Sequence, residues 1–416
     1  MRAIGTFRNR RRKRTRSISN RPLRSFRRKK WEGELYAMGV LLLFLALLLV
    51  AGCGAAGGGR DAASQMPEKN KELLWPEPPL IPRIKYVGFL RSQNDLTKDG
   101  GAQFVDVLLG SKRLPDSLNQ PMAIAPSPDG KRLYVSDYIK RGVYVFDFQN
   151  NQMFRFGVGR QADSFRRPLG ITVDAKGNVY VVDSDLKAVR VFDSKGNFLR
   201  NIASPRLERP TGIALDPSRQ RIYVADSSKR DSKNHLVHIF REDGTHLKTL
   251  GAGVGSRQGE FIFPTYLTVD PKGNVYVADT LNARIQVFDS EGRYVKTIGE
   301  RGDAIGMFFR PKGIALDTFG NVYVVDSGWS NIQIFNQTGQ VLLFFGARGR
   351  LPGLLFNPTG IAIDGQNRIY IADTFNQRVN IYQLINTTAK DSLTPASAQA
   401  QKGSPAPQPP KEGASK

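Results

Sequence analysis

The sequence is poor in the residues that build disulfide frameworks and metal centres. It has a single cysteine, Cys53, which excludes a disulfide scaffold and a cysteine-rich metal site. Its three histidines all lie within residues 235–246, which leaves little room for a histidine-based metal centre. Tryptophan is also scarce, with 3 residues, whereas the 24 Phe and 13 Tyr are typical of a chain rich in strands.

Long apolar runs are missing as well. The longest, residues 37–51, has fifteen residues, whereas crossing a bilayer takes about twenty, so the composition excludes a multi-span membrane protein. The net charge is +24, and residues 1–30 hold fourteen Lys and Arg and no acidic residue. Residues 53–416 therefore carry only half of the net charge, +12. A basic segment followed by a short apolar run is typical of a secretory signal.

The residues after this apolar run carry a more specific motif. Residues 50–53, VAGC, closely resemble the lipobox of bacterial lipoproteins. The resemblance implies that residues 1–52 are a lipoprotein signal peptide and that Cys53 receives a covalent lipid, which anchors the exported chain to the membrane of the cell envelope. By resemblance to Gram-negative sorting signals, Gly54 after the cysteine implies the outer rather than the inner membrane. The basic region is longer than such signals usually have, and an uncleaved signal anchor is the alternative.

Two segments have the composition of linkers. Residues 53–82 are rich in Gly and then in Pro, and we expect a tether that stiffens towards its end. Residues 386–416 consist mainly of Ala, Ser, Pro, Gln and Lys. Because this tail has little apolar surface to bury, the sequence predicts that it is disordered.

Between these segments the chain repeats. Six similar tetrads occur: YVSD (134–137), YVVD (180–183), YVAD (223–226), YVAD (276–279), YVVD (323–326) and YIAD (370–373). Their aspartates are spaced by 46, 43, 53, 47 and 47 residues, and each tetrad is flanked by further strand-like segments and turns. Four short strands in a period of about 45 residues are the signature of a propeller blade.

The consensus PxGIAxDxxGNVYVADxxNxRIxVFD closely resembles the NHL repeat, over roughly residues 121–385. The predicted fold is therefore all-β, a six-bladed β-propeller of four-stranded NHL-type blades over residues 83–385. Two copies depart from the pattern, at residues 122–126 and at residues 265–267, where Tyr266 replaces the glycine. The third copy carries an insertion at residues 228–234.

The sixth copy ends at its third strand, which would leave an unpaired edge beside the point where the ring closes. Residues 83–91 have the alternating pattern of a strand and are expected to complete this blade. Residues 103–109 are a rival candidate.

The aspartates that end the tetrads form an apparent carboxylate array. A fold needs the same residue in every blade, whereas a catalytic site needs particular residues once, so we interpret them as structural turn residues. They are Asp137, Asp183, Asp226, Asp279, Asp326 and Asp373.

The loops that precede the inner strands are rich in arginine, and aromatic residues follow the tetrads. In a propeller these loops and turns share one face, and arginine with aromatic side chains suits a binding surface; a merely solvated rim is the alternative. The candidate partner-binding residues are Arg160, Arg166, Arg167, Arg206, Arg209, Arg257, Arg301, Arg310, Arg348, Arg350, Tyr138, Trp329 and Phe375.

Together these features favour a non-catalytic binding or scaffold module of the cell envelope whose partner is an envelope protein or an anionic polymer. We predict no metal and no cofactor besides the lipid on Cys53. The alternative is a metal-dependent lyase or lactonase-like hydrolase with calcium or zinc in the central channel. RNA binding, known for some animal NHL proteins, is suggested by the +12 charge but opposed by export, so no nucleic acid is expected.

Overall fold

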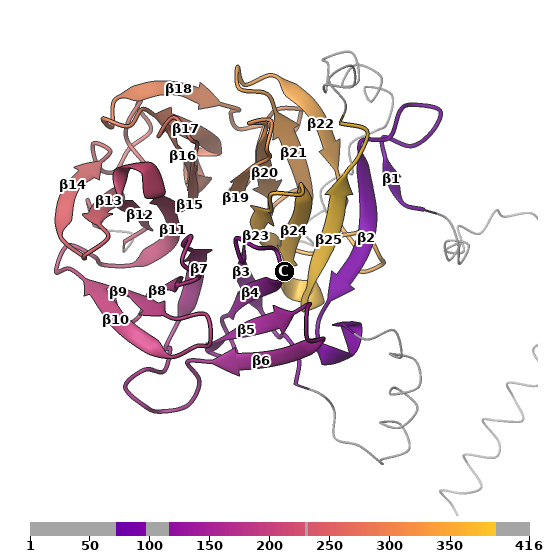
Figure 1. Cartoon of the computed structure of the whole chain (residues 1–416). Coiled ribbons are helices and arrows are strands. Elements are labelled where there is room, and N and C mark those ends of the chain that lie inside the picture. The colour runs from indigo at the N-terminus through magenta and orange to yellow at the C-terminus, as the bar shows by residue number, and fades with distance from the viewer. Residues whose placement is uncertain (1–71, 97–115, 229–231, 388–416) are drawn as a thin grey trace, which may run out of the picture. The chain divides into compact units, whose positions relative to one another are not determined.

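The structure is a computed structural model that describes residues 72–96, 116–228 and 232–387 (Figure 1). These residues belong to one compact unit, residues 70–416. The predicted signal peptide, the candidate lipidation site Cys53, the rival strand at residues 103–109 and most of the predicted tail lie outside the described residues. In the described ranges, no helix has the length and apolarity needed to cross a membrane.

The described chain forms six antiparallel sheets that surround a central channel as the blades of a propeller (Figure 1). The first three blades are β3 (Pro121–Pro126), β4 (Arg132–Asp137), β5 (Gly142–Asp147) and β6 (Gln152–Phe156); β7 (Pro168–Val173), β8 (Val179–Asp183), β9 (Ala188–Phe192) and β10 (Phe198–Ala203); and β11 (Pro210–Asp216), β12 (Arg221–Asp226), β13 (Leu236–Arg241) and β14 (His246–Leu250). The next two are β15 (Pro264–Val269), β16 (Val275–Asp279), β17 (Arg284–Phe288) and β18 (Tyr294–Ile298); and β19 (Pro311–Leu316), β20 (Val322–Asp326), β21 (Asn331–Phe335) and β22 (Val341–Phe345). The predicted all-β, six-bladed architecture is confirmed.

The sixth blade joins the two ends of the propeller. It contains β23 (Pro358–Ile363), β24 (Arg368–Asp373) and β25 (Arg378–Leu384), and its fourth strand is β2 (Ile84–Leu90) from the N-terminal side. β2 pairs antiparallel with β25, with Ile84 opposite Leu384 and Leu90 opposite Val379. The segment near residues 83–91 therefore covers the edge of the last blade, at the position expected from the sequence.

One part of the predicted tether belongs to the folded blade instead. β1 (Leu74–Trp75) pairs with β2 as a fifth strand, and the Trp75 ring lies 6.0 Å from that of Phe345 and 5.8 Å from that of Tyr382. At the other end, the Ile385 amide donates to the Arg83 carbonyl and the Asn386 side chain to that of Pro82. The tether boundary at residue 82 was wrong because Pro-rich composition conceals the apolar surface that Trp75 buries, and the fold extends past the predicted end at residue 385.

The apolar core is divided among the interfaces between blades. Six clusters of buried side chains occur, and each combines strands of two neighbouring blades. The cluster between blades one and two, for example, joins Val143 and Val145 with Val179 and Val181, all with no exposed surface. Because burying one such side chain stabilises a fold by about 1.5–3 kcal/mol, adjacent blades hold each other in place.

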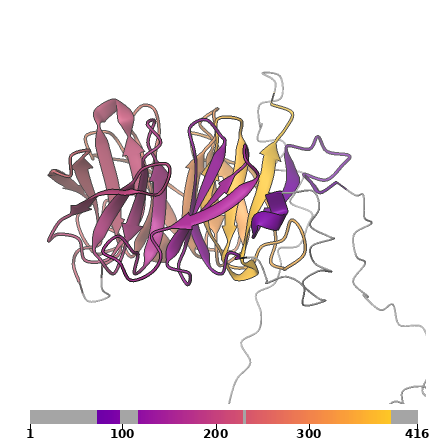
Figure 2. The same cartoon turned by 60° about the horizontal axis from the view of Figure 1, so that its bottom comes forward.

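Antiparallel connections divide the propeller into two faces (Figure 2). The links between blades and the turns between second and third strands lie on one side, which we call the loop face. The turns between first and second and between third and fourth strands lie on the other, the turn face. Of the short 3-10 helices, η2 (Pro217–Arg219) lies on the turn face, and η3 (Thr280–Asn282) and η4 (Thr374–Asn376) on the loop face, whereas η1 (Gln93–Leu96) follows β2.

Candidate binding site at the mouth of the central channel

The six tetrad aspartates are wholly buried at the base of the loop face. The Asp183 carboxylate accepts hydrogen bonds from the Arg166 and Arg167 amides, at 2.7 and 3.1 Å, and from the Leu186 amide in its own turn. The others also bind amides of the link that precedes their blade: Asp137 binds those of Asn119 and Gln120, Asp226 those of Glu208 and Arg209, Asp279 that of Ile262, Asp326 those of Phe309 and Arg310, and Asp373 that of Phe356. Each carboxylate thus fixes an interblade link as well as a turn.

These hydrogen bonds stabilise the ionised form of carboxylates that are buried away from water. Burial raises the pKa of Asp326, and amides of Phe309, Arg310, Trp329 and Gly328 oppose this rise. Burial likewise raises the pKa of Asp226, Asp279 and Asp373. Since the hydrogen-bonding capacity of these carboxylates is occupied by the chain itself, they serve the fold rather than a ligand.

A ring of six side chains lines the channel where it opens on the loop face. Each is the second residue of an innermost strand, and the six are Met122, Leu169, Thr211, Thr265, Lys312 and Thr359. They surround a cavity of about 340 Å³, which we call the channel-mouth cavity. Two of the threonines are engaged with the next blade: the Thr211 hydroxyl donates to the Thr265 carbonyl at 3.0 Å and the Thr359 hydroxyl to that of Met122 at 2.8 Å.

Tyr266 crosses the channel at this level. Its hydroxyl, on β15 of blade four, donates to the Met122 carbonyl on β3 of blade one at 2.9 Å, and burial raises its pKa. In blade six the equivalent residue is Gly360, where a Cβ atom would lie 2.6 Å from the Met122 carbonyl oxygen. The two sequence copies that depart from the repeat are therefore the two that touch across the channel.

The cationic residues of the cavity come from three blades. Arg167 and Arg209, each immediately before an inner-strand proline, line the cavity together with Lys312. Burial, together with the nearby positive charge of Arg310, lowers the pKa of Lys312 to about 8. No carboxylate is among the described residues that line the cavity. The mouth of the channel is therefore suited to an anionic group.

Several of the predicted arginines lie against aromatic rings around this mouth. The Arg167 guanidinium is 5.6 Å from the Tyr138 ring, and that of Arg310 is 5.3 Å from the Phe309 ring, which in turn packs on Trp329. Further round, Arg209 lies over Phe263, and Arg348 and Arg350 over Phe356, which contacts Phe375. Such contacts limit the motion of the guanidinium groups without using their N–H donors, although Arg167 Nε also pairs with Asp185 Oδ1 at 3.0 Å.

The other candidates do not join this cluster. Arg160, Arg166, Arg206 and Arg257 are exposed on the loop face outside the cavity, and Arg301 donates to the Leu281 carbonyl. Of the predicted set, Tyr138, Arg167, Arg209 and Phe375 line the cavity. Lys312 was not among the predicted residues, although its charge is unique among the six equivalent positions, and no role was predicted for Tyr266.

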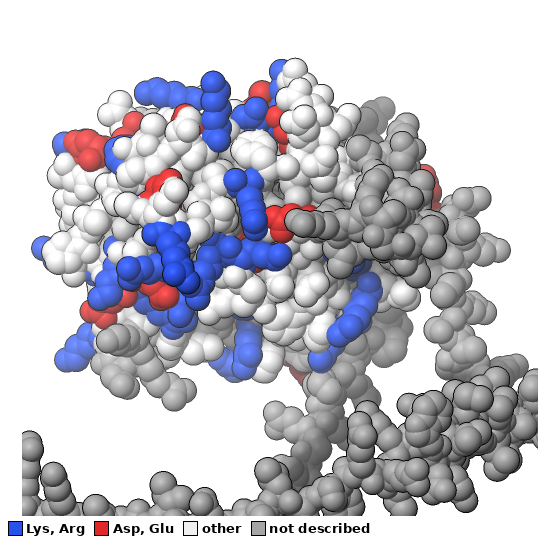
Figure 3. Space-filling model, turned by 90° about the horizontal axis from the view of Figure 1, so that it is seen from below, with Lys and Arg blue, Asp and Glu red and all other residues white. Residues whose placement is uncertain are grey.

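Exposed apolar side chains also concentrate on the loop face. Of the fifteen large hydrophobic residues exposed in the described chain, seven lie on its loops and turns: Ile139, Val254, Leu281, Ile305, Phe309, Leu351 and Phe375. Within the same ranges the turn face exposes three: Phe319 in the β19–β20 turn, and Leu80 and Ile81 in the β1–β2 connection, which lies at the turn-face end of β2. Seen from below, Lys and Arg side chains gather across the middle of the molecule with fewer acidic ones among them (Figure 3). Apolar residues next to arginine and aromatic side chains are typical of protein interfaces.

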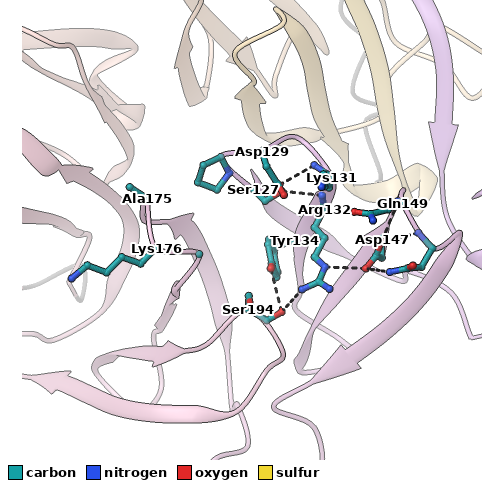
Figure 4. A pocket seen from close by; sticks show the side chains of 13 residues that line it. Ser127, Asp129, Lys131, Arg132, Tyr134, Asp147, Gln149, Ala175, Lys176 and Ser194 are labelled. Carbon is teal, nitrogen blue, oxygen red and sulfur yellow. Dashed lines mark hydrogen bonds and ion pairs between the residues drawn. The ribbon is translucent and has the colours of Figure 1, made fainter.

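A second cavity, of about 380 Å³, lies on the turn face between blades one and two (Figure 4). Its half-buried charges are paired with the chain itself: Arg132 Nε lies 3.0 Å from Asp147 Oδ2, and Arg132 Nη1 donates to the Ser194 carbonyl. Asp129 accepts from the Ser127 hydroxyl at 2.6 Å. The remaining charged side chains of the lining, Lys131 and Lys176, are exposed, so this cavity has the interactions of a blade interface.

The histidines do not form a metal site. His235 accepts a hydrogen bond from the Phe263 amide, whereas His238 packs against His246 inside blade three, where burial lowers the pKa of His238 to about 4. Across residues 72–96, 116–228 and 232–387, no three His, Cys, Asp or Glu side chains are placed to hold a metal ion. The channel-mouth ring itself consists of Met, Leu, Thr and Lys, which do not fit calcium or zinc.

Comparison with known families supports this fold. Residues 86–229 match the family model of the SMP-30/Gluconolactonase/LRE-like region, and residues 271–329 match a family described as 6-bladed beta-propeller. The predicted resemblance to NHL-type six-bladed propellers is confirmed by a match to NHL repeat-containing protein 2 of Gallus gallus, which is 26% identical over 41% of this chain and 27% of the relative.

Other similar proteins differ widely in their names. Protein brain tumor of Drosophila melanogaster is 35% identical over 35% of this chain and 14% of its own length. Peptidyl-glycine alpha-amidating monooxygenase A of Xenopus laevis is 32% identical over 32% of this chain and 15% of its own length. The chain thus spans less than a third of these curated relatives. A solved protein of unknown function from Bacteroides thetaiotaomicron has a TM-score of 0.51 at 18% identity, covering 64% of this chain and 70% of that one, which shows a shared fold.

Proposed function

We propose that the protein is a non-catalytic binding module whose loop face binds an acidic protein partner. The observation that carries this proposal is the difference between the faces: seven exposed large apolar residues lie on the loop face beside stacked arginines such as Arg310 and Arg348, whereas three such apolar residues lie on the turn face. Buried aromatic and arginine side chains provide most of the binding energy in many interfaces, and an excess of arginine selects acidic partners.

The cellular setting is part of the same proposal. The lipobox-like residues 50–53 support export and lipid anchoring through Cys53, with the outer membrane favoured. The partner is then an envelope protein with an acidic surface; an anionic polymer of the envelope is the alternative, and nucleic acid is not expected at that location.

The competing function is a metal-dependent lyase or lactonase-like hydrolase; the name of the matched region points towards the latter. Such chemistry needs oxygen or nitrogen ligands that converge in the channel. No carboxylate or imidazole lines the channel-mouth cavity, and within the described residues no three His, Cys, Asp or Glu side chains are placed to hold a metal ion. We therefore favour binding over catalysis.

Charge reversal on one face tests the proposal. Arg166, Arg310 and Arg350 are exposed on the loop face, and none lines the cavity. We expect that changing all three to Glu strongly reduces the partners captured from envelope extracts and leaves the melting temperature nearly unchanged, because exposed substitutions usually alter stability by less than about 0.5 kcal/mol.

The matched control reverses three exposed lysines on the turn face, Lys176, Lys195 and Lys272. It changes the net charge by the same amount, so a general effect of charge would reduce capture equally in both variants. Equal capture by the parent and the loop-face variant would contradict the proposal.

A further inference from the structure

Lys312 lies at a position where the fold does not require a charged residue. The five equivalent residues around the channel are Met122, Leu169, Thr211, Thr265 and Thr359, and all are neutral. Thr211 and Thr359 bind the next blade, and Met and Leu fill the same place without hydrogen bonds. A charge at one of six repeated positions therefore points to a local role rather than to the architecture.

The ammonium group of Lys312 lacks a counter-ion. Within the part of the chain that the structure describes, it makes no hydrogen bond or ion pair, and Asp326 is the one carboxylate that favours its charge. That carboxylate already accepts hydrogen bonds from four backbone amides. Leaving a half-buried cation unpaired is unfavourable, so a negatively charged group entering the cavity would recover interaction energy.

The rest of the cavity suits a carboxylate. Arg167 and Arg209 stand at its rim, and guanidinium groups bind carboxylates with two parallel hydrogen bonds. Gln120 and Asn357, which occupy the same pre-proline position in blades one and six, add neutral amides. The volume of about 340 Å³ lies within the range of small-molecule sites.

We propose that the channel-mouth cavity binds a carboxylate-bearing group, with Lys312 as its innermost ligand and Arg167 and Arg209 at the rim. This inference rests on the proposed function where the group is an acidic side chain of the partner. A small free organic acid presents the same chemistry.

The groups around Lys312 determine how binding depends on pH. They are Arg310 on its own loop, Asp326 at the end of β20, Tyr266 on β15 and the rim arginines. Between pH 7 and 9 burial keeps the Tyr266 hydroxyl neutral, because it raises the pKa of this group. Lys312 loses its proton in this window, since its pKa is about 8, and only the protonated form attracts an anion.

The experiment is titration of the full chain with glutarate by calorimetry. We expect the parent to bind, Lys312→Met to bind at least ten-fold more weakly, and the affinity of the parent to fall several-fold between pH 7 and pH 9. Met is tolerated at the equivalent position of blade one, so folding should be kept, which a melting curve checks. Lys272→Met removes the same charge from the turn face and should bind like the parent. Equal binding by parent and Lys312→Met, or no binding by the parent, would overturn the proposal.

Envelope capture in the presence of saturating glutarate then identifies the source of the carboxylate. Loss of capture assigns it to the partner, whereas unchanged capture assigns the site to a free acid; both outcomes keep the site. Failure of the proposed function looks different: Arg166, Arg310 and Arg350 become dispensable for capture while glutarate still binds in a Lys312-dependent way.

Discussion

The two faces of the propeller are built from the same strands but differ in what their connections carry. On the turn face the links are short: five residues join β7 to β8, and Asp174 accepts from the Lys176 and Asn178 amides within that turn. On the loop face thirteen residues join β14 to β15, and the sequences of the links differ from blade to blade. Short turns closed by their own aspartates vary little in length, whereas longer links can vary in length and sequence and carry a binding surface.

The comparison shows where repetition ends in this molecule. Residues that recur in all blades, such as the tetrad aspartates, are buried beneath the loop face and support it. Residues found once, such as Lys312 and Tyr266, lie in the channel between the faces. The buried layer therefore makes the variable surface rigid.

The largest expected effect comes from breaking this support. Asp326→Ala would leave the amides of Phe309, Arg310, Gly328 and Trp329 without their acceptor, and buried unpaired amides are costly. We expect a loss of about 3 kcal/mol, or about 6–12 °C in melting temperature. The measurement is thermal unfolding followed by circular dichroism.

The control for this change is on the turn face. Asp289 also accepts from two amides, those of Glu291 and Arg293, but water can reach it. Asp289→Ala should therefore shift the melting temperature much less. Equal shifts for the two variants would mean that the loop face is not specially supported.

An intermediate effect is expected on binding. Phe309 on the loop face and Phe319 on the turn face are 44% and 54% exposed, so they are matched in residue type and accessibility. Phe309→Ala should reduce partner capture about ten-fold, equivalent to about 1.4 kcal/mol, as for other aromatic interface residues. Phe319→Ala should leave capture unchanged, and both are compared in envelope pull-downs. If only Phe319→Ala reduced capture, the binding surface would lie on the turn face and the proposal would be wrong.

The smallest expected effect is on stability and concerns the channel that runs between the two faces. Tyr266→Phe removes the hydroxyl that donates to the Met122 carbonyl across the channel. We expect a loss of about 1 kcal/mol in the free energy of unfolding, measured by urea denaturation. Tyr294→Phe removes an exposed hydroxyl of the same blade and should have no measurable effect. Identical curves for both variants and the parent would show that the cross-channel contact does not stabilise the ring.

Much of the fold followed from the sequence because its signals are local and repeated. Each tetrad lies at the end of a strand, which stops at the tetrad aspartate. The alternating segment near residues 83–91 forms β2, which pairs with β25. The tether was misjudged at its end, because the packing of Trp75 on Phe345 and Tyr382 joins residues about 270 and 307 positions apart along the chain. No local composition can indicate such a contact.

By itself, the sequence determined the repeat, the identity of the strands, the structural role of the aspartates and the concentration of arginine in the links. Only the tertiary structure decided which of these residues meet: Arg167 and Arg209 join Lys312 in one cavity, whereas Arg160 and Arg257 lie outside it. It also brought Tyr266 to Met122, 144 residues away. The physical reason is closure of the ring, because the second residue of an inner strand faces the other five blades only after all six have been assembled around the axis.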